Sequence, residues 1–243
     1  MKFPFVYIAD NPSAVASAFA DKLKEWNDQN PISPFHIALS GGTTPKLLFE
    51  ILACDFVNKI NWENIHFWWG DERCVDPDDD ESNYKWANLL LFEKINIPKQ
   101  NIHRIKGEEN PETEAVRYGN LMLRLAPEKN NIPCFDLVIL GLGEDGHTAS
   151  IFPDNLRLLS SPDYCAVAVH PQSGQKRITL TGTVLNNAHK VAFLVTGRNK
   201  SDKVYEIIYN SGNAIEYPAS HIKPKNGELM WFLDQNAASN FPE

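Results

Sequence analysis

The stretch Phe135-Asp136-Leu137-Val138-Ile139-Leu140 runs directly into Gly141-Leu142-Gly143-Glu144-Asp145-Gly146-His147. The first six residues are apolar apart from one aspartate, which is typical of a strand buried on both faces of a parallel sheet. The next seven are glycine and polar residues in the main, which is typical of a loop. The stretch therefore predicts a central strand over residues 135–140, with a polar loop at its carboxyl end.

Strand and helix patterns alternate on both sides of this strand. Strands are predicted over residues 3–8, 35–40, 65–69, 165–169, 177–180, 191–195 and 229–233, with a weak one over 102–105. Helices are predicted after Asn11-Pro12, over 45–53, from Ser82 through 95, after Asn110-Pro111 and over 200–209. This alternation predicts a doubly wound, mainly parallel α/β sheet of Rossmann-like type with helices on both faces. Without a repeat or a linker, we expect one domain over residues 1–243.

Charge and composition exclude several classes of protein. The 243 residues carry 23 Lys and Arg against 31 Asp and Glu, a formal charge of −8, which disfavours nucleic acid as a partner. A small anionic substrate stays open, because a few local cations can outweigh the overall charge. Four dispersed cysteines without a C-x-x-C pair predict reduced thiols in a cytoplasmic protein. No apolar run approaches the roughly 20 residues of a membrane span, so we expect no membrane association.

Three polar clusters follow predicted strands: residues 40–44, 70–73 and 141–147. In doubly wound sheets, ligands bind beyond the carboxyl ends of the strands, where such loops converge. This coincidence predicts an enzyme site formed by the three loops.

The first cluster, Ser40-Gly41-Gly42-Thr43-Thr44, joins a strand to a helix. Glycines allow a ligand to approach the backbone closely, and the free amides and dipole at a helix start favour an anion. The P-loop spacing is absent. Taken alone, the segment fits a phosphate site and a plain capped turn equally well.

The second cluster, Gly70-Asp71-Glu72-Arg73, ends in a cation that can bind a phosphate or carboxylate with two hydrogen bonds. In isolation, an ion-paired surface loop is the simpler interpretation. The same holds for two further cations, Arg177 and Lys200. The acidic run over residues 76–81 lacks the spacing of a calcium loop and is interpreted as solvated.

The third cluster matches G-x-G-x-x-G, so a nicotinamide-dependent dehydrogenase has to be considered. Glu144 and Asp145 would place carboxylates against the pyrophosphate, and the next strand ends in His170-Pro171 rather than in an acid. His147 fits a general base better, with Asp145 to orient its ring, and is expected to open a helix. An isolated histidine is more often a packing residue, which is our interpretation of His36, His66 and His189.

The motifs together resemble a known family, the glucosamine-6-phosphate isomerases and 6-phosphogluconolactonases. The resemblance rests on Ser40–Pro45, Trp69–Arg73, Ser82–Tyr84, Gly141–Pro153, Arg177–Thr181 and Pro218–Ser220, in this order along nearly the whole chain. Arg73, where the deaminases carry a tyrosine, and the continuation after His147 both favour the lactonase branch. Gln172-Ser173-Gly174 stands where that branch usually has Lys-Pro-Pro.

The resemblance implies hydrolysis of 6-phospho-D-glucono-1,5-lactone to 6-phosphogluconate, in the oxidative pentose phosphate pathway, without a metal or organic cofactor. It implies catalytic roles for His147, Asp145 and Arg73. The expected contacts to the phosphorylated sugar lactone are Ser40, Gly41, Gly42, Thr43, Thr44, Asp71, Arg73, Arg177 and Lys200. Whether Asp71 takes part in the chemistry or holds Arg73 stays open. An amino-sugar phosphate deaminase and a non-catalytic sugar-phosphate sensor are the alternatives.

Overall fold

A computed structural model describes residues 4–29 and 33–242, and a parallel sheet of six strands forms its centre. The order across the sheet is β1-β11-β10-β7-β2-β3, and every neighbouring pair is parallel. The strands are β1 (Phe5–Ala9), β2 (Phe35–Leu39), β3 (Ile65–Trp69), β7 (Leu137–Leu140), β10 (Lys190–Val195) and β11 (Glu228–Asp234). The predicted parallel α/β fold is thus confirmed.

The chain reverses its direction of winding between β7 and β2, which lie side by side with Ala38 opposite Val138. From β2 the chain proceeds outward to β3, whereas from β7 it proceeds to β10 on the other side. Such a switch point leaves a crevice at the carboxyl ends of the two strands. The strand predicted over residues 135–140 therefore lies beside the expected binding crevice.

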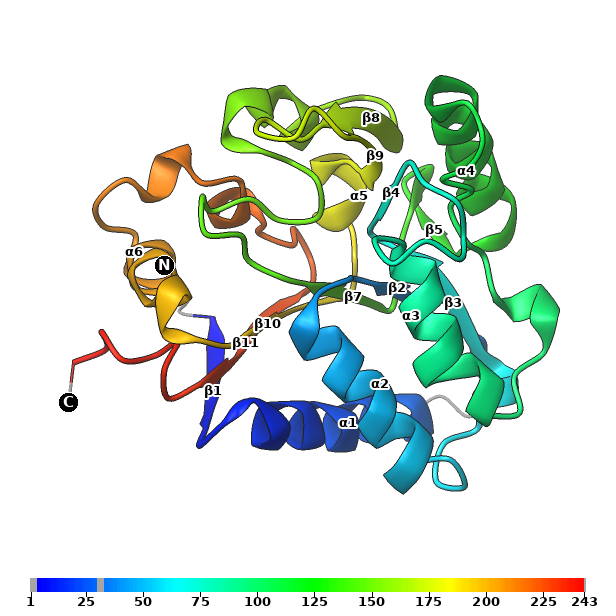
Figure 1. Cartoon of the computed structure of the whole chain (residues 1–243), viewed down its shortest axis with the longest axis horizontal. Coiled ribbons are helices and arrows are strands. Elements are labelled where there is room, and N and C mark those ends of the chain that lie inside the picture. The colour runs from blue at the N-terminus through cyan, green and yellow to red at the C-terminus, as the bar shows by residue number, and fades with distance from the viewer. Residues whose placement is uncertain (1–3, 30–32, 243) are drawn as a thin grey trace.

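Helices cover both faces of this sheet (Figure 1). Helices α1 (Pro12–Gln29) and α2 (Thr43–Asp55) pack together below it in this view, while α5 (Gly182–Leu185) lies above. The other helices are α3 (Asn83–Leu90), α4 (Pro111–Leu125) and α6 (Ser201–Tyr209). Two predicted caps are confirmed, because Ser82 Oγ accepts the Lys85 N–H and Asn110 Oδ1 accepts the Thr113 N–H.

A second, three-stranded sheet was not predicted. Strands β8 (Cys165–Val169) and β9 (Lys176–Leu180) pair antiparallel with each other, and β9 pairs antiparallel with β4 (Asp71–Arg73). The segments around 165–169 and 177–180 are strands as expected, but they do not join the parallel sheet. The two sheets meet at Gly70, whose N–H donates to Leu39 O and whose carbonyl accepts the Leu180 N–H, both at 2.7 Å. Helix α4 packs on the second sheet.

Several predicted boundaries are wrong. Helix α2 begins at Thr43 rather than residue 45, and the helix after Ser82 ends at Leu90. Residues 102–105 contribute only the bridge between Phe67 and Ile102. Met1 to Phe3, and with them the start of the first predicted strand, lie outside the described residues. Short elements complete the fold: β5 (Glu128–Lys129), β6 (Ile132–Pro133) and 3₁₀ turns at Trp62–Asn64, Phe92–Lys94, Lys99–Asn101, Pro153–Leu159, Arg198–Lys200, Ala214–Glu216 and Pro218–His221.

The buried apolar side chains form one continuous cluster that includes residues of both sheets. On the α1 face, Phe19 meets Phe232 edge-on at 5.1 Å between ring centroids. On the opposite face, Phe193 and Trp231 stack at 4.1 Å. None of the described helices is long and apolar enough to cross a membrane. The shared core supports the expectation of a single domain.

Candidate active site

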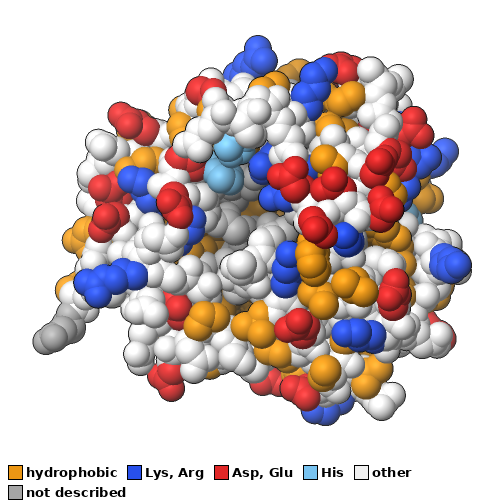
Figure 2. All heavy atoms as spheres, in the orientation of Figure 1, with side chains coloured by type: hydrophobic (Ala, Val, Ile, Leu, Met, Phe, Trp, Pro, Cys, Tyr) orange, Lys and Arg blue, Asp and Glu red, His pale blue; other side chains and the backbone are white. Residues whose placement is uncertain are grey.

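The three predicted loops meet at one end of the sheet. Residues 40–44 follow β2, residues 141–147 follow β7, and Gly70 follows β3, so the loops extend from neighbouring strands. A Cβ on Gly141 would lie 3.9 Å from Ser40 Oγ, which shows how closely the first two loops approach. Figure 2 shows a hollow in the surface with histidine side chains at its rim and Lys and Arg side chains nearby.

His147 and Asp145 form the predicted pair. The Nδ1 atom of His147 lies 2.6 Å from Asp145 Oδ1, and the His147 backbone N–H donates to the same oxygen at 3.0 Å. Partial burial alone would raise the pKa of Asp145, but the hydrogen bonds from His147 lower it to about 2. An ionised carboxylate holds the ring proton on Nδ1 and leaves Nε2 as the basic atom. The His147 side chain is 25% exposed, so water reaches it.

Backbone geometry rather than a helix places this pair. Residues 141–150 form turns, so the prediction that His147 opens a helix is wrong. A Cβ on Gly143 would lie 2.1 Å from His147 Nδ1, because the imidazole occupies the space above that glycine. Gly146 has φ of +86°, a conformation that strains other residues. Gly143 therefore leaves room for the His147 ring, and Gly146 allows the turn before it and the close approach of Tyr217.

The loop over residues 40–44 opens α2 with free backbone amides. Gly42, with φ of +107°, is the N-cap of α2, so the N–H groups of Thr43 and Thr44 begin the helix without intrahelical acceptors. The Thr44 hydroxyl lies 2.9 Å from that of Thr196, which follows β10. A Cβ on Gly41 would collide with the Asn83 side chain. This geometry is that of an anion site at a helix start.

Asp71 connects three segments around the site. Its Oδ2 accepts the Ser150 hydroxyl at 2.6 Å, while its backbone carbonyl accepts Asn83 Nδ2 at 3.0 Å. The side chain is buried, with 5% of the residue exposed. Asp71 therefore holds the loop of His147 and the start of α3 together, and does not pair with Arg73.

Glu72 anchors the start of α3. Its carboxylate accepts the backbone N–H groups of Arg73, Asn83 and Tyr84 at 2.7–2.8 Å. Burial raises the pKa of Glu72 to about 7, against the effect of these donors. Glu72 is thus a structural residue of the second cluster.

Arg73 and Arg177 lie directly opposite each other on β4 and β9. Opposed residues of antiparallel strands point to the same face of the sheet, so two positive side chains stand together. Burial lowers the pKa of Arg177, and the charge of Arg73 lowers it further. The Nε atoms of both are buried without a hydrogen-bond partner, and neither arginine has an ion pair within the described part of the chain. Arg73 Nη1 donates to the Glu81 carbonyl, but neither guanidinium group is paired with a carboxylate of the described residues. Two such neighbouring groups favour an anion between them.

Lys200 lies on the other side of the histidine loop. Its Nζ is 4.0 Å from Glu144 Oε1, and burial lowers its pKa. It is the N-cap residue of α6, so the helix predicted over residues 200–209 begins one residue later, at Ser201. The structure thus places Lys200 near Asp145 and Glu144 but shows no contact between Lys200 and the two arginines.

Sequence reasoning missed two residues of this region. Phe152 is fully buried, and its ring centroid lies 4.9 Å from that of His147. The second is His170, which entered the sequence reasoning only because a dinucleotide-binding fold would carry an acid there. Its ring centroid lies 5.2 Å from that of Phe152. Its position at the end of a predicted strand was the available indication.

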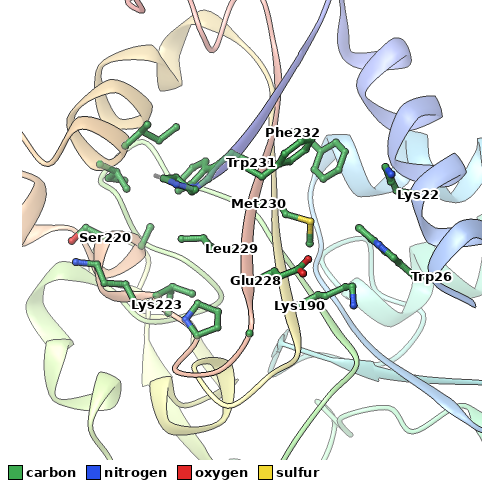
Figure 3. A pocket seen from close by; sticks show the side chains of 18 of the residues that line it. Lys22, Trp26, Lys190, Ser220, Lys223, Glu228, Leu229, Met230, Trp231 and Phe232 are labelled. Atoms are coloured by element: carbon green, nitrogen blue, oxygen red, sulfur yellow. The ribbon is translucent and has the colours of Figure 1, made fainter. Parts of the chain in front are cut away.

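A groove of about 1010 Å³ lies elsewhere, at the amino ends of β1, β10 and β11 (Figure 3). It is lined by Lys22, Trp26, Lys190, Lys223, Glu228 and Trp231 among others. It lies away from the carboxyl ends of the strands, where such sheets bind ligands. Within the described residues, no cluster of three or more His, Cys, Asp or Glu side chains could hold a metal ion.

The fold is that of an α/β enzyme, with a histidine–carboxylate pair and two neighbouring arginines near the switch point of its parallel sheet. The chain belongs to the family described as glucosamine-6-phosphate isomerases/6-phosphogluconolactonase, whose model matches residues 10–231. It is 46% identical over 205 residues to a 6-phosphogluconolactonase of Haemophilus influenzae, covering 84% of this chain and 86% of that one. A 6-phosphogluconolactonase of Treponema pallidum is 38% identical over 191 residues, 79% of each chain.

Solved structures agree. The 6-phosphogluconolactonase of Trypanosoma brucei superposes with a TM-score of 0.87 at 28% identity, covering 99% of this chain and 100% of that one. A monomeric glucosamine-6-phosphate deaminase shares the fold, with a TM-score of 0.79 at 19% identity over 97% of this chain and 99% of that one. The family resemblance stated from the motifs is confirmed.

Proposed function

We propose that this chain hydrolyses 6-phospho-D-glucono-1,5-lactone to 6-phospho-D-gluconate, the second step of the oxidative pentose phosphate pathway. The observation that carries the proposal is the pairing of His147 with Asp145 at 2.6 Å, near two arginines that have no ion pair among the described residues. The 6-phosphogluconolactonases among its relatives support the substrate class. A cytoplasmic location agrees with the four free cysteines of the described residues.

His147 Nε2 takes a proton from a water molecule, which then attacks the lactone carbonyl. The Asp145 carboxylate stabilises the imidazolium that forms, and His147 returns the proton to the leaving ring oxygen. The leaving group remains tethered to the product, so no covalent enzyme intermediate is needed. General-base catalysis contributes about 10²–10⁴-fold, and oriented electrostatics supply the rest.

The phosphate binds at the other end of the site in this proposal. Arg73 and Arg177 supply charge and hydrogen bonds, and the amides of residues 41–44 add donors. Lys200 adds positive charge on the far side of the histidine loop. Asp71 contributes by position, since its carboxylate is committed to Ser150.

The test is hydrolysis of freshly generated lactone by the purified chain. Formation of 6-phosphogluconate must exceed the spontaneous rate in a matched reaction without protein. A matched reaction with glucosamine 6-phosphate measures ammonia, because a deaminase shares the fold. Ammonia release without lactone turnover would instead establish the deaminase. Binding of 6-phosphogluconate without turnover of either substrate would indicate a sensor.

A further inference from the structure

The hairpin between β8 and β9 brings a second histidine to the site. The His170 N–H donates to Gln175 O at 2.9 Å, which closes the hairpin. The imidazole Nδ1 accepts the backbone N–H groups of Ser173 at 3.1 Å and Gln172 at 3.4 Å. Because Nδ1 is an acceptor, the proton of the neutral ring lies on Nε2. Across residues 4–29 and 33–242, Nε2 has no hydrogen-bond partner.

Phe152 is the common neighbour of His170 and the proposed site residues. The His170 ring meets Phe152 edge-on, with an interplanar angle of 82°. The His147 ring lies on Phe152 at 4.9 Å, and Arg177 Cζ lies 5.8 Å from its centroid. A fully buried phenyl ring has little freedom to move, so it fixes the positions of the three groups around it.

The charges that act on His170 belong to the same site. Burial lowers its pKa, and the positive charges of Arg177, His147 and Arg73 lower it further, while Asp145 opposes them. At neutral pH the ring is therefore uncharged and offers one N–H donor. Ala168, two residues before His170, lies opposite Arg177, which in turn lies opposite Arg73. Because side chains alternate along a strand, His170 is on the same face of the second sheet as the two arginines, where an anion between them would bind.

We propose that His170 is a substrate-binding residue that donates its Nε2–H to a phosphate oxygen held by Arg73 and Arg177. This rests on the proposed function, because it requires a phosphorylated substrate. The contact is remote from the reacting carbonyl, so it stabilises the bound substrate and the transition state equally. Its loss therefore raises KM and leaves kcat almost unchanged.

Two substitutions of His170 distinguish its two functions, donation from Nε2–H and acceptance of hairpin amides by Nδ1. In His170→Asn the amide oxygen replaces Nδ1 as acceptor of the Ser173 N–H, but no donor remains at the Nε2 position. In His170→Gln the longer side chain places an N–H₂ group near that position. We expect His170→Asn to raise KM about tenfold with kcat within about twofold, the effect of one hydrogen bond to a charged group. His170→Gln should recover most of this loss.

Inhibition by inorganic phosphate provides an independent readout. Its inhibition constant should rise in His170→Asn by the same factor as KM, and thermal unfolding should confirm that each variant folds. The matched control is His189→Asn, at the amino end of β10, which should change neither constant. The His189 side chain is exposed, so its interpretation as a packing residue is wrong.

An unchanged KM and phosphate inhibition constant in folded His170→Asn would overturn the proposal. Equal losses of kcat in the Asn and Gln variants at constant KM would also overturn it, since they would indicate a structural role. Failure of the wild-type chain to hydrolyse the lactone would count against the proposed function instead. In that case, the phosphate-binding difference between wild type and His170→Asn, measured by calorimetry, still decides the role of His170.

Discussion

Two groups of histidines in this molecule have opposite surroundings. At the edge of the parallel sheet, His66 Nδ1 lies 3.0 Å from His103 Nε2, and Trp68 Nε1 donates to His36 Nδ1 at 3.1 Å. The rings stack on one another, with 4.0 Å between the centroids of Trp68 and His103. At the strand ends, His147 has a carboxylate partner and is partly exposed.

The surroundings decide what each imidazole can do. Burial lowers the pKa of His36 to about 3 and that of His103 to about 4, with neighbouring histidines adding to the effect. These rings stay neutral and fill space. The carboxylate beside His147 instead stabilises the cation that a base becomes after it takes a proton. A carboxylate partner and access to water therefore distinguish the proposed base from the packing histidines.

The largest contrast is expected from removing one ring of each group. His147→Ala should lower kcat about 10²–10⁴-fold with little change in KM, because the base acts only in the transition state. His103→Phe, which keeps an aromatic ring against Trp68, should leave kcat unchanged. Steady-state lactone hydrolysis measures both. Near-normal turnover by His147→Ala would show that the base is misassigned.

A smaller effect is expected from the carboxylate that distinguishes the two groups. Asp145→Asn keeps the size of the side chain but removes the charge opposite the imidazolium. We expect kcat to fall by about 10–10²-fold, the value of about 1.5–3 kcal/mol for a hydrogen bond between charged groups. Steady-state lactone hydrolysis measures the change. An unaltered kcat would contradict the orienting role of Asp145.

Loss of a proposed phosphate-binding arginine should change KM, whereas loss of the proposed base should change kcat. Arg73→Ala should raise KM by about tenfold or more, since the phosphate contact is made in the ground state and in the transition state. Lys22→Ala, a cation on α1 away from the site, is the control. A loss confined to kcat would place Arg73 at the reacting carbonyl instead.

The packing histidines should affect stability, and only in acid. In the folded chain His36 and His103 resist protonation, whereas in the unfolded chain they take a proton below pH of about 6.5. Stability should thus fall as the pH drops from 6.5 toward 4, by about 2 kcal/mol for each histidine at pH 5. Urea unfolding at pH 7.5 and 5 measures this, and His103→Phe should reduce the slope. Equal slopes in both proteins would refute the explanation.

Much of the fold follows from the sequence, because apolar runs and caps are local. The strand over residues 65–69 and the caps at Ser82 and Asn110 are found where their patterns place them. The second sheet could not be predicted, because β4 has only three residues and pairs with β9 more than 100 positions later. Whether a strand joins one sheet or another depends on long-range packing that local patterns do not encode.

The site was predictable in its clusters but not in its pairings. His147 and Asp145 are two residues apart, so a local contact could be foreseen, and the structure has it. The commitment of Asp71 to Ser150 and the approach of His170 to Phe152 join distant segments. They depend on how the antiparallel sheet sits on the parallel one.

That junction has a consequence for the choice of substrate. The proposed base extends from the parallel sheet and the two arginines from the antiparallel one, and the backbone bonds of Gly70 connect the sheets without a flexible segment. The span between the base and the arginines is consequently fixed. If the proposed roles hold, we expect a sugar phosphate with one carbon fewer or more between its carbonyl and its phosphate to fit both groups less well, so that the junction contributes to selecting the substrate by length.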